Sequence, residues 1–175
     1  MHFAEPIFGL DKLAGGGETS RLFNVSLNGE PILVSFDIVA DAFGENNTDI
    51  KVFKDVQPAA DGRLHLRFTA GQHESPILSA LEVIPSKPGL MNPVRIVASD
   101  RGFYDPDGDL WQADNFVSGG RIVRRSPIEL PNVNGNLFAS ERYGNFTYMI
   151  PVAVNGRYRV RIHFCERCFG CIRCL

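Results

Sequence analysis

Short runs in which every second residue is apolar, separated by tight-turn dipeptides, constrain this fold more than any other feature of the sequence. The turn dipeptides are Asn-Gly or Asp-Gly pairs at residues 28–29, 61–62, 134–135 and 155–156. The alternating runs around them lie at residues 23–27, 32–38, 64–68, 150–154 and 158–164. A period of two buries one face of a strand, and such turns join antiparallel neighbours. We therefore expect an all-β protein, an antiparallel β-sandwich of the jelly-roll kind, without a long amphipathic helix.

Two runs allow more specific expectations. After the first turn the core face is expected to hold Ile32, Val34, Phe36 and Ile38, because these residues keep the period of two. The stretch Ser79–Ile84 reads instead as a more deeply buried strand, since apolar residues dominate it.

Composition excludes several classes of protein. The chain has 175 residues with 44% hydrophobic and 22% charged residues, which suits one globular domain with a real core. Its formal net charge is −2 and it has no basic block, so we expect no nucleic-acid partner. No apolar run reaches the length of a membrane span, and the first residues do not resemble a secretory signal.

The two ends of the chain resemble each other. Residues 2–9 and 163–170 are identical at five of eight aligned positions, reading HFAEPIFG and HFCERCFG. The simplest interpretation is a window cut from a tandem array of domains, or one domain permuted so that its termini fall inside a loop. A site near this loop would then take residues from both ends.

A proline-rich stretch divides the chain. Three prolines and a glycine between Ile84 and Pro93 cannot sustain a helix or a central strand. We expect residues 1–84 and 94–175 to be two half-domains joined by a linker at 85–93, together closing one sandwich. The alternative is that each half pairs with a neighbouring repeat or with another copy of the chain.

The second half resembles the N-terminal half of a malectin domain. The residues that carry this resemblance are Tyr104-Asp105, Gly108, Trp111, Asp114, Phe116, Gly119-Gly120, Glu141 to Gly144, Phe146 to Tyr148, Ile150-Pro151 and His163-Phe164. The first half is similar to the C-terminal half of such a domain, through Phe3 to Glu5, Arg21 to Val25, Asn28-Gly29, Phe36 to Ile38 and Leu78 to Val83. The resemblance implies a circularly permuted, malectin-like β-sandwich.

Malectins bind carbohydrate without chemistry on the ligand, so the resemblance implies a non-catalytic module for glucose-type oligosaccharides, with no cofactor. It implies a ligand site in which aromatic rings stack on sugar faces and polar groups bind hydroxyls. The residues that map onto this site are Phe8, Glu74, Phe116, Tyr143 and Phe169, and we expect Arg142 to hydrogen-bond the sugar beside Glu74. Phe116 lacks the hydroxyl of the tyrosine in the animal protein, and both copies of the terminal loop lack a tyrosine as well. For every one of these rings the alternative is ordinary core packing.

The family also implies neighbouring malectin repeats as partners and favours an extracellular or cell-surface location. The single tryptophan, Trp111, fits a structural role better than a ligand contact.

Five aspartates lie between Asp100 and Asp114. Paired carboxylates can serve a glycosidase, and clustered oxygens can bind calcium. The spacing does not match an EF-hand loop, however, and aspartates beside glycine and proline mostly form turns through local hydrogen bonds. We therefore expect turns here, and no metal site.

All four cysteines lie near the end, at Cys165, Cys168, Cys171 and Cys174. Their even spacing matches neither a ferredoxin motif nor a paired zinc site. A truncated or frame-shifted end explains the run better than a metal or redox site, which remains the third hypothesis for function. The second hypothesis is a structural or protein-interaction β-sandwich that has lost sugar binding.

Overall fold

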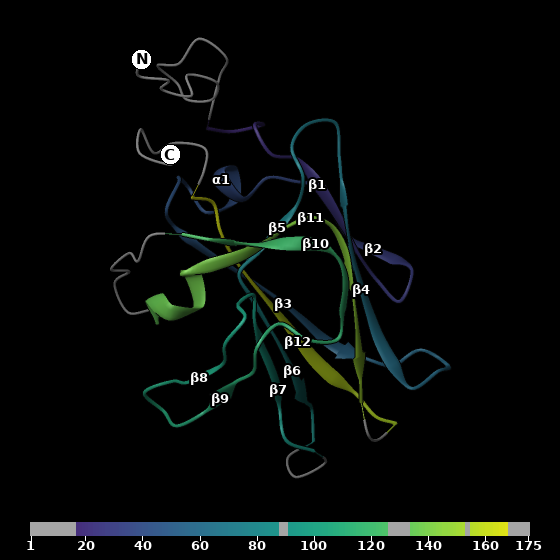
Figure 1. The fold of residues 1–175 in the computed structure, drawn as a ribbon. Helices are drawn as coiled ribbons and strands as arrows, with labels where there is room; N and C mark the ends of the chain where they lie inside the picture. Colours follow the sequence, from purple (N-terminus) through teal and green to yellow (C-terminus); the bar gives the residue numbers. More distant parts are fainter. Residues whose placement is uncertain (1–16, 88–90, 126–133, 153–154, 168–175) are drawn as a thin grey trace.

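The computed structural model describes residues 17–87, 91–125, 134–152 and 155–167, and nearly all of the regular secondary structure in these ranges is antiparallel β-sheet (Figure 1). In chain order, the elements are β1 (Phe23–Leu27), β2 (Glu30–Phe36), α1 (Ile38–Asp41), β3 (Thr48–Val56), β4 (Arg63–Ala70), β5 (Ile77–Leu78), β6 (Ala80–Pro85), β7 (Val94–Val97), β8 (Phe103–Tyr104), β9 (Leu110–Trp111), β10 (Val117–Arg124), the 3-10 helix η1 (Gly135–Phe138), β11 (Ser140–Pro151) and β12 (Tyr158–Cys165).

Two sheets enclose the main core. The larger has the order β10-β11-β4-β1-β2, with β5 pairing to β11, and the smaller has the order β3-β12-β6-β7. Buried side chains from both sheets, such as Phe23, Phe68, Ile150 and Phe164, form one hydrophobic cluster. The expected all-β, antiparallel sandwich is therefore confirmed. The helices in the described part of the chain are single turns, and none has the length and hydrophobicity that a bilayer crossing needs.

The period-two pattern correctly predicts which side chains enter the core on three strands. β1 alternates buried and half-buried residues, and β4 buries Leu64, Leu66 and Phe68. On β12, Tyr158 and the apolar residues after it at every second position are buried. Of the stretch at 79–84, residues 79–83 are buried as expected, and Ile84 on β6 is half-buried.

The pattern is wrong for β2. Val34, expected in the core, is 70% exposed, although Phe36 is buried as predicted. The pairing of β1 with β2 contains two register shifts, and Ser35 adopts a positive φ of 49°. Each extra residue in a β-bulge moves the following side chains to the other face, so the alternation cannot hold across them. Ile38 is buried, but it begins α1 rather than continuing the strand.

Strands from before and after the proline-rich stretch share both sheets. In the larger sheet β11 pairs with β4, and in the smaller sheet β12 lies between β3 and β6. β6 and β7, on either side of residues 88–90, are antiparallel partners. The two segments of sequence therefore contribute to a single core.

The hairpin of β8 and β9 accompanies a second, smaller core on the outer face of the smaller sheet. Trp111 is 4% exposed and clusters with Val97, Phe138 and Cys165, among others. Its indole N–H donates to Asp105 Oδ2 at 3.0 Å, and its ring meets His163 edge to face. These contacts give Trp111 the structural role expected for it.

Candidate functional site

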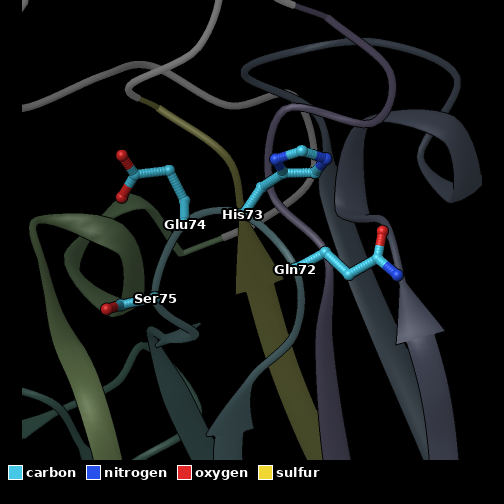
Figure 2. A pocket seen from close by; sticks show the side chains of 4 residues that line it. All are labelled: Gln72, His73, Glu74 and Ser75. Atoms are coloured by element: carbon cyan, nitrogen blue, oxygen red, sulfur yellow. The ribbon is translucent and has the colours of Figure 1, made fainter.

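The loop between β4 and β5 borders a cavity of about 390 Å³. Among the described residues, Gln72, His73, Glu74 and Ser75 line it, and their side chains spread in different directions around the loop (Figure 2). The loop begins at Gly71, whose N–H donates to Leu22 O at 2.9 Å. A Cβ on Gly71 would lie 2.4 Å from that same oxygen, so only glycine allows the loop to turn this close to the neighbouring backbone.

Glu74 and Tyr143 meet beside this cavity. The Tyr143 hydroxyl donates to Glu74 Oε2 at 3.1 Å, although 69 residues separate the two in the sequence. The pairing of β5 with β11 produces the contact, because it places Ile77 opposite Tyr143 and so brings the preceding loop to the tyrosine. Two of the predicted site residues are thus neighbours, and both side chains are partly accessible.

Arg21 supports this pair from inside the protein, and the sequence did not identify it as a site residue. It is 2% exposed, its Nε donates to Glu166 Oε2 at 2.5 Å, and its Nη1 donates to the Ser75 carbonyl. Its guanidinium carbon lies 5.7 Å from the centre of the Tyr143 ring. One buried cation therefore ties the cavity loop, the tyrosine ring and the end of β12 together. The sequence signal that pointed to this part of the structure was Glu166, which is identical to Glu5 in the alignment of residues 2–9 with 163–170.

A second guanidinium approaches the same ring from solvent. Arg121 is exposed, and its guanidinium carbon lies 5.4 Å from the centre of the Tyr143 ring. Cations are attracted to the negative face of an aromatic ring. Exposed side chains change rotamer within nanoseconds, so Arg121 is able to leave the ring when a ligand takes its place.

Arg142, predicted to bind a ligand, is held in an internal ion pair. It is 9% exposed, its Nε donates to Asp114 Oδ2 at 2.7 Å, and its Nη1 donates to Gly119 O at 2.5 Å. The other oxygen of Asp114 accepts from the Tyr148 hydroxyl. Burial and the adjacent Asp114 raise the pKa of Tyr148 well above its ordinary value, so its hydroxyl stays protonated as a donor. Successive strand residues face opposite ways, so Arg142 turns away from Tyr143.

Phe116 lies at the other end of the β10–β11 pair. Its carbonyl accepts from Met149 N, whereas Tyr143 is opposite Arg121 on β10. Met149 lies six positions along β11 from Tyr143, or roughly 20 Å of extended strand. Phe116 is 41% exposed, but the structure does not bring it to the Glu74–Tyr143 pair. The other two predicted rings, Phe8 and Phe169, lie outside the described residues.

Within the aspartate cluster, Asp105, Asp107 and Asp109 form a turn, as expected, whereas Asp100 and Asp114 form ion pairs with arginines. Asp105 Oδ1 accepts from the backbone N–H groups of Asp107 and Asp109, at 3.0 and 2.9 Å. The indole N–H of Trp111, together with these amides, holds the pKa of the Asp105 carboxyl below its ordinary value. Within the described ranges, no group of three or more acidic, histidine or cysteine side chains is placed to hold a metal ion.

Cys165 is fully buried and carries a free thiol. Burial raises its pKa to about 12, which keeps it protonated, whereas metal binding and redox chemistry need the thiolate. The other three cysteines lie outside the described residues.

With the site's geometry established, comparison with known families identifies the second half of the chain. Residues 95–172 match the family model of the malectin domain. This stretch is therefore similar to malectin domains. Malectin domains are carbohydrate-binding modules, and the match contains Tyr143 of the candidate site but not Glu74. Searches of curated proteins and of solved structures found no match.

Proposed function

We propose that the chain is a non-catalytic carbohydrate-binding module that holds a glucose-type oligosaccharide at the Glu74–Tyr143 pair. The observation that carries this proposal is the hydrogen bond from Tyr143 to Glu74 at the edge of a cavity. The malectin match supports the ligand class, since members of this family bind sugars and are generally not catalysts.

The chemistry of the pair suits a sugar. The half-buried Tyr143 ring offers an apolar surface for the C–H face of a pyranose, while its hydroxyl orients the carboxylate of Glu74. The free lone pairs of that carboxylate can accept two sugar hydroxyls as charge-assisted hydrogen bonds. Gln72 and His73 are exposed on the same loop and add further polar groups.

Glycan-array screening followed by titration calorimetry tests the proposal. Glu74→Gln keeps the shape but removes the charge, and a hydrogen bond to a charged group contributes about 1.5–3 kcal/mol, so affinity should fall at least tenfold. Tyr143→Ala should abolish detectable binding, since it removes both the stacking surface and the group that orients Glu74. Tyr104→Ala, at an exposed tyrosine on the β8–β9 hairpin, is the matched control and should bind normally.

A scaffold that has lost sugar binding is the second candidate, and one observation favours it. Two guanidiniums lie over the Tyr143 ring, so a ligand has to displace or share that surface with Arg121. A protein that binds no glycan on the array, and whose Arg121→Ala variant binds none either, would have this scaffold function.

We also propose that residues 1–84 and 94–175 are the two halves of one permuted domain, joined at residues 85–93. The sharing of both sheets between the two segments supports a single sandwich. Neighbouring malectin repeats would then be the partners in a longer protein, and sequencing the gene on either side of this stretch tests for them.

A further inference from the structure

Phe43 is the most exposed large apolar side chain among the described residues. It lies in the loop between α1 and β3, is 94% exposed, and has a positive φ of 56°. Bulky residues rarely occupy this left-handed region, and such local strain persists only where the surrounding structure enforces it. A phenylalanine held in this way in full contact with water suggests a ligand surface.

The loop that carries Phe43 is fixed at several points. Gly44 N donates to Val39 O at 2.9 Å, and Asn47 Nδ2 donates to Ala42 O at 3.1 Å. Asn46 N donates to Glu166 O at 2.9 Å. The ring is therefore presented on an ordered backbone, which lowers the entropy that a ligand would lose on binding it.

The same contacts place this loop at the end of the sandwich that holds the cavity. The Glu166 carbonyl accepts a hydrogen bond from Asn46 N, and its carboxylate accepts one from Arg21. Arg21 in turn donates to the Ser75 carbonyl of the cavity loop. A second hydrogen bond connects α1 to the segment that carries Arg21, because Thr19 N donates to the side chain of Asp37, the N-cap of α1. Figure 1 shows α1 and the loop before β5 at one end of the molecule.

We propose that Phe43 is a second aromatic platform for the glycan held at Tyr143, so that the protein selects chains of several sugars over single sugars. This inference rests on the proposed function. Phe43 lies in the loop between α1 and β3 and Tyr143 lies on β11, and Arg21 and Glu166 connect the two. The exposed Gln72 and His73 lie on the cavity loop. Stacking on Phe43 requires no polar partner, so it adds affinity without specifying the sugar's hydroxyls.

Titration with glucose oligosaccharides of increasing length, in the linkage that the array identifies, tests the inference. The wild-type protein should bind longer chains more tightly than the monosaccharide. Phe43→Ala should lose about three- to tenfold in affinity for the longer chains and nothing for the monosaccharide, in keeping with the contribution of one stacked ring. Phe43→Tyr keeps the ring and should keep the gain, while Tyr143→Ala should lose binding at every length.

Several results would overturn the inference. Wild-type affinity that does not rise with chain length, or a Phe43→Ala variant equal to wild type on long chains, removes Phe43 from the site and leaves the proposed function intact. A wild-type protein that binds no glycan overturns both proposals together. Light scattering in which Phe43→Ala dissociates an oligomer, with sugar affinity unchanged, would assign the ring to a protein contact instead.

Discussion

The buried carboxylate of Glu82, on β6, contacts three basic side chains. Its carboxylate lies 3.0 Å from Arg95 Nε, 3.2 Å from His163 Nε2 and 3.3 Å from Arg161 Nη1. Burial by itself raises the pKa of this carboxyl, but the hydrogen bond and charge of His163 and the two arginines outweigh it and hold the pKa below its ordinary value. The charged form is therefore the one that the fold stabilises.

This residue should contribute to acid denaturation. An acid whose pKa is lower in the folded state stabilises the protein above its unfolded pKa and loses that contribution as pH falls through the folded value. Urea denaturation from about pH 6 to about pH 3 should show stability falling below about pH 5. Glu82→Gln should flatten that decline and cost about 1.5–3 kcal/mol at neutral pH, because it removes the buried carboxylate that accepts charge-assisted hydrogen bonds from Arg95 and Arg161. The exposed Glu30→Gln is the control, and an equal effect there would contradict the prediction.

Residue identities in the site were only partly predictable from the sequence. Glu74 and Tyr143 were identified through the family resemblance, and the structure brings them together. Arg21 was not identified, because a buried arginine is improbable until its partner is known, and Glu166 lies 145 residues away. The internal pairing of Arg142 with Asp114 was equally invisible, since Asp114 lies in the loop between β9 and β10, 28 residues away in the sequence.

At the scale of elements, β10 contains a bulge that depends on its glycines. Gly119 has a φ of +80°, and a register shift lies between it and Arg121. A Cβ on Gly119 would lie 2.6 Å from Asn145 O on the neighbouring strand. The bulge turns the Gly119 carbonyl to Arg142 and carries Arg121 to the Tyr143 ring.

Gly119→Ala should therefore destabilise the protein through both strain and a clash. The left-handed φ costs about 1–3 kcal/mol for a residue with a Cβ, and displacement of β11 adds to it. Gly62→Ala is the matched control, because Gly62 has a φ of +73° but no atom within 4 Å of the added methyl. Chemical denaturation should show a larger loss in the free energy of unfolding for Gly119→Ala than for Gly62→Ala. Equal losses would mean that the close approach to Asn145 does not contribute to the destabilisation.

The strands themselves were more predictable than their irregularities. Alternation located the core faces of β1, β4 and β12, because a regular pleat repeats every two residues. It failed at Val34, since a bulge depends on how the partner strand pairs and leaves no periodic signal.

At the scale of the whole molecule, neither segment of sequence can complete a sheet by itself. In the larger sheet, β11 from the second segment is the partner of β4 from the first. In the smaller sheet, β12 from the second segment lies between β3 and β6 from the first. The long-range pairings thus run across the proline-rich stretch.

Expression of residues 1–87 and 91–175 as separate chains tests this dependence. Each should be unfolded or aggregated alone, because it would expose unpaired strand edges and half of the core. Mixing the two should restore a β-sheet circular dichroism spectrum and a cooperative thermal transition. A fragment that folds by itself into a stable monomer would contradict the prediction.

The interior position of β11 and β12 also affects how the protein is made. Both strands come late in the chain, so a ribosome releases β1 to β6 long before their partners exist. Long-range β pairing is slow and leaves exposed edges open to aggregation meanwhile. The nascent chain should therefore remain a client of chaperones until residues near 165 have left the exit tunnel, and then fold in one late step.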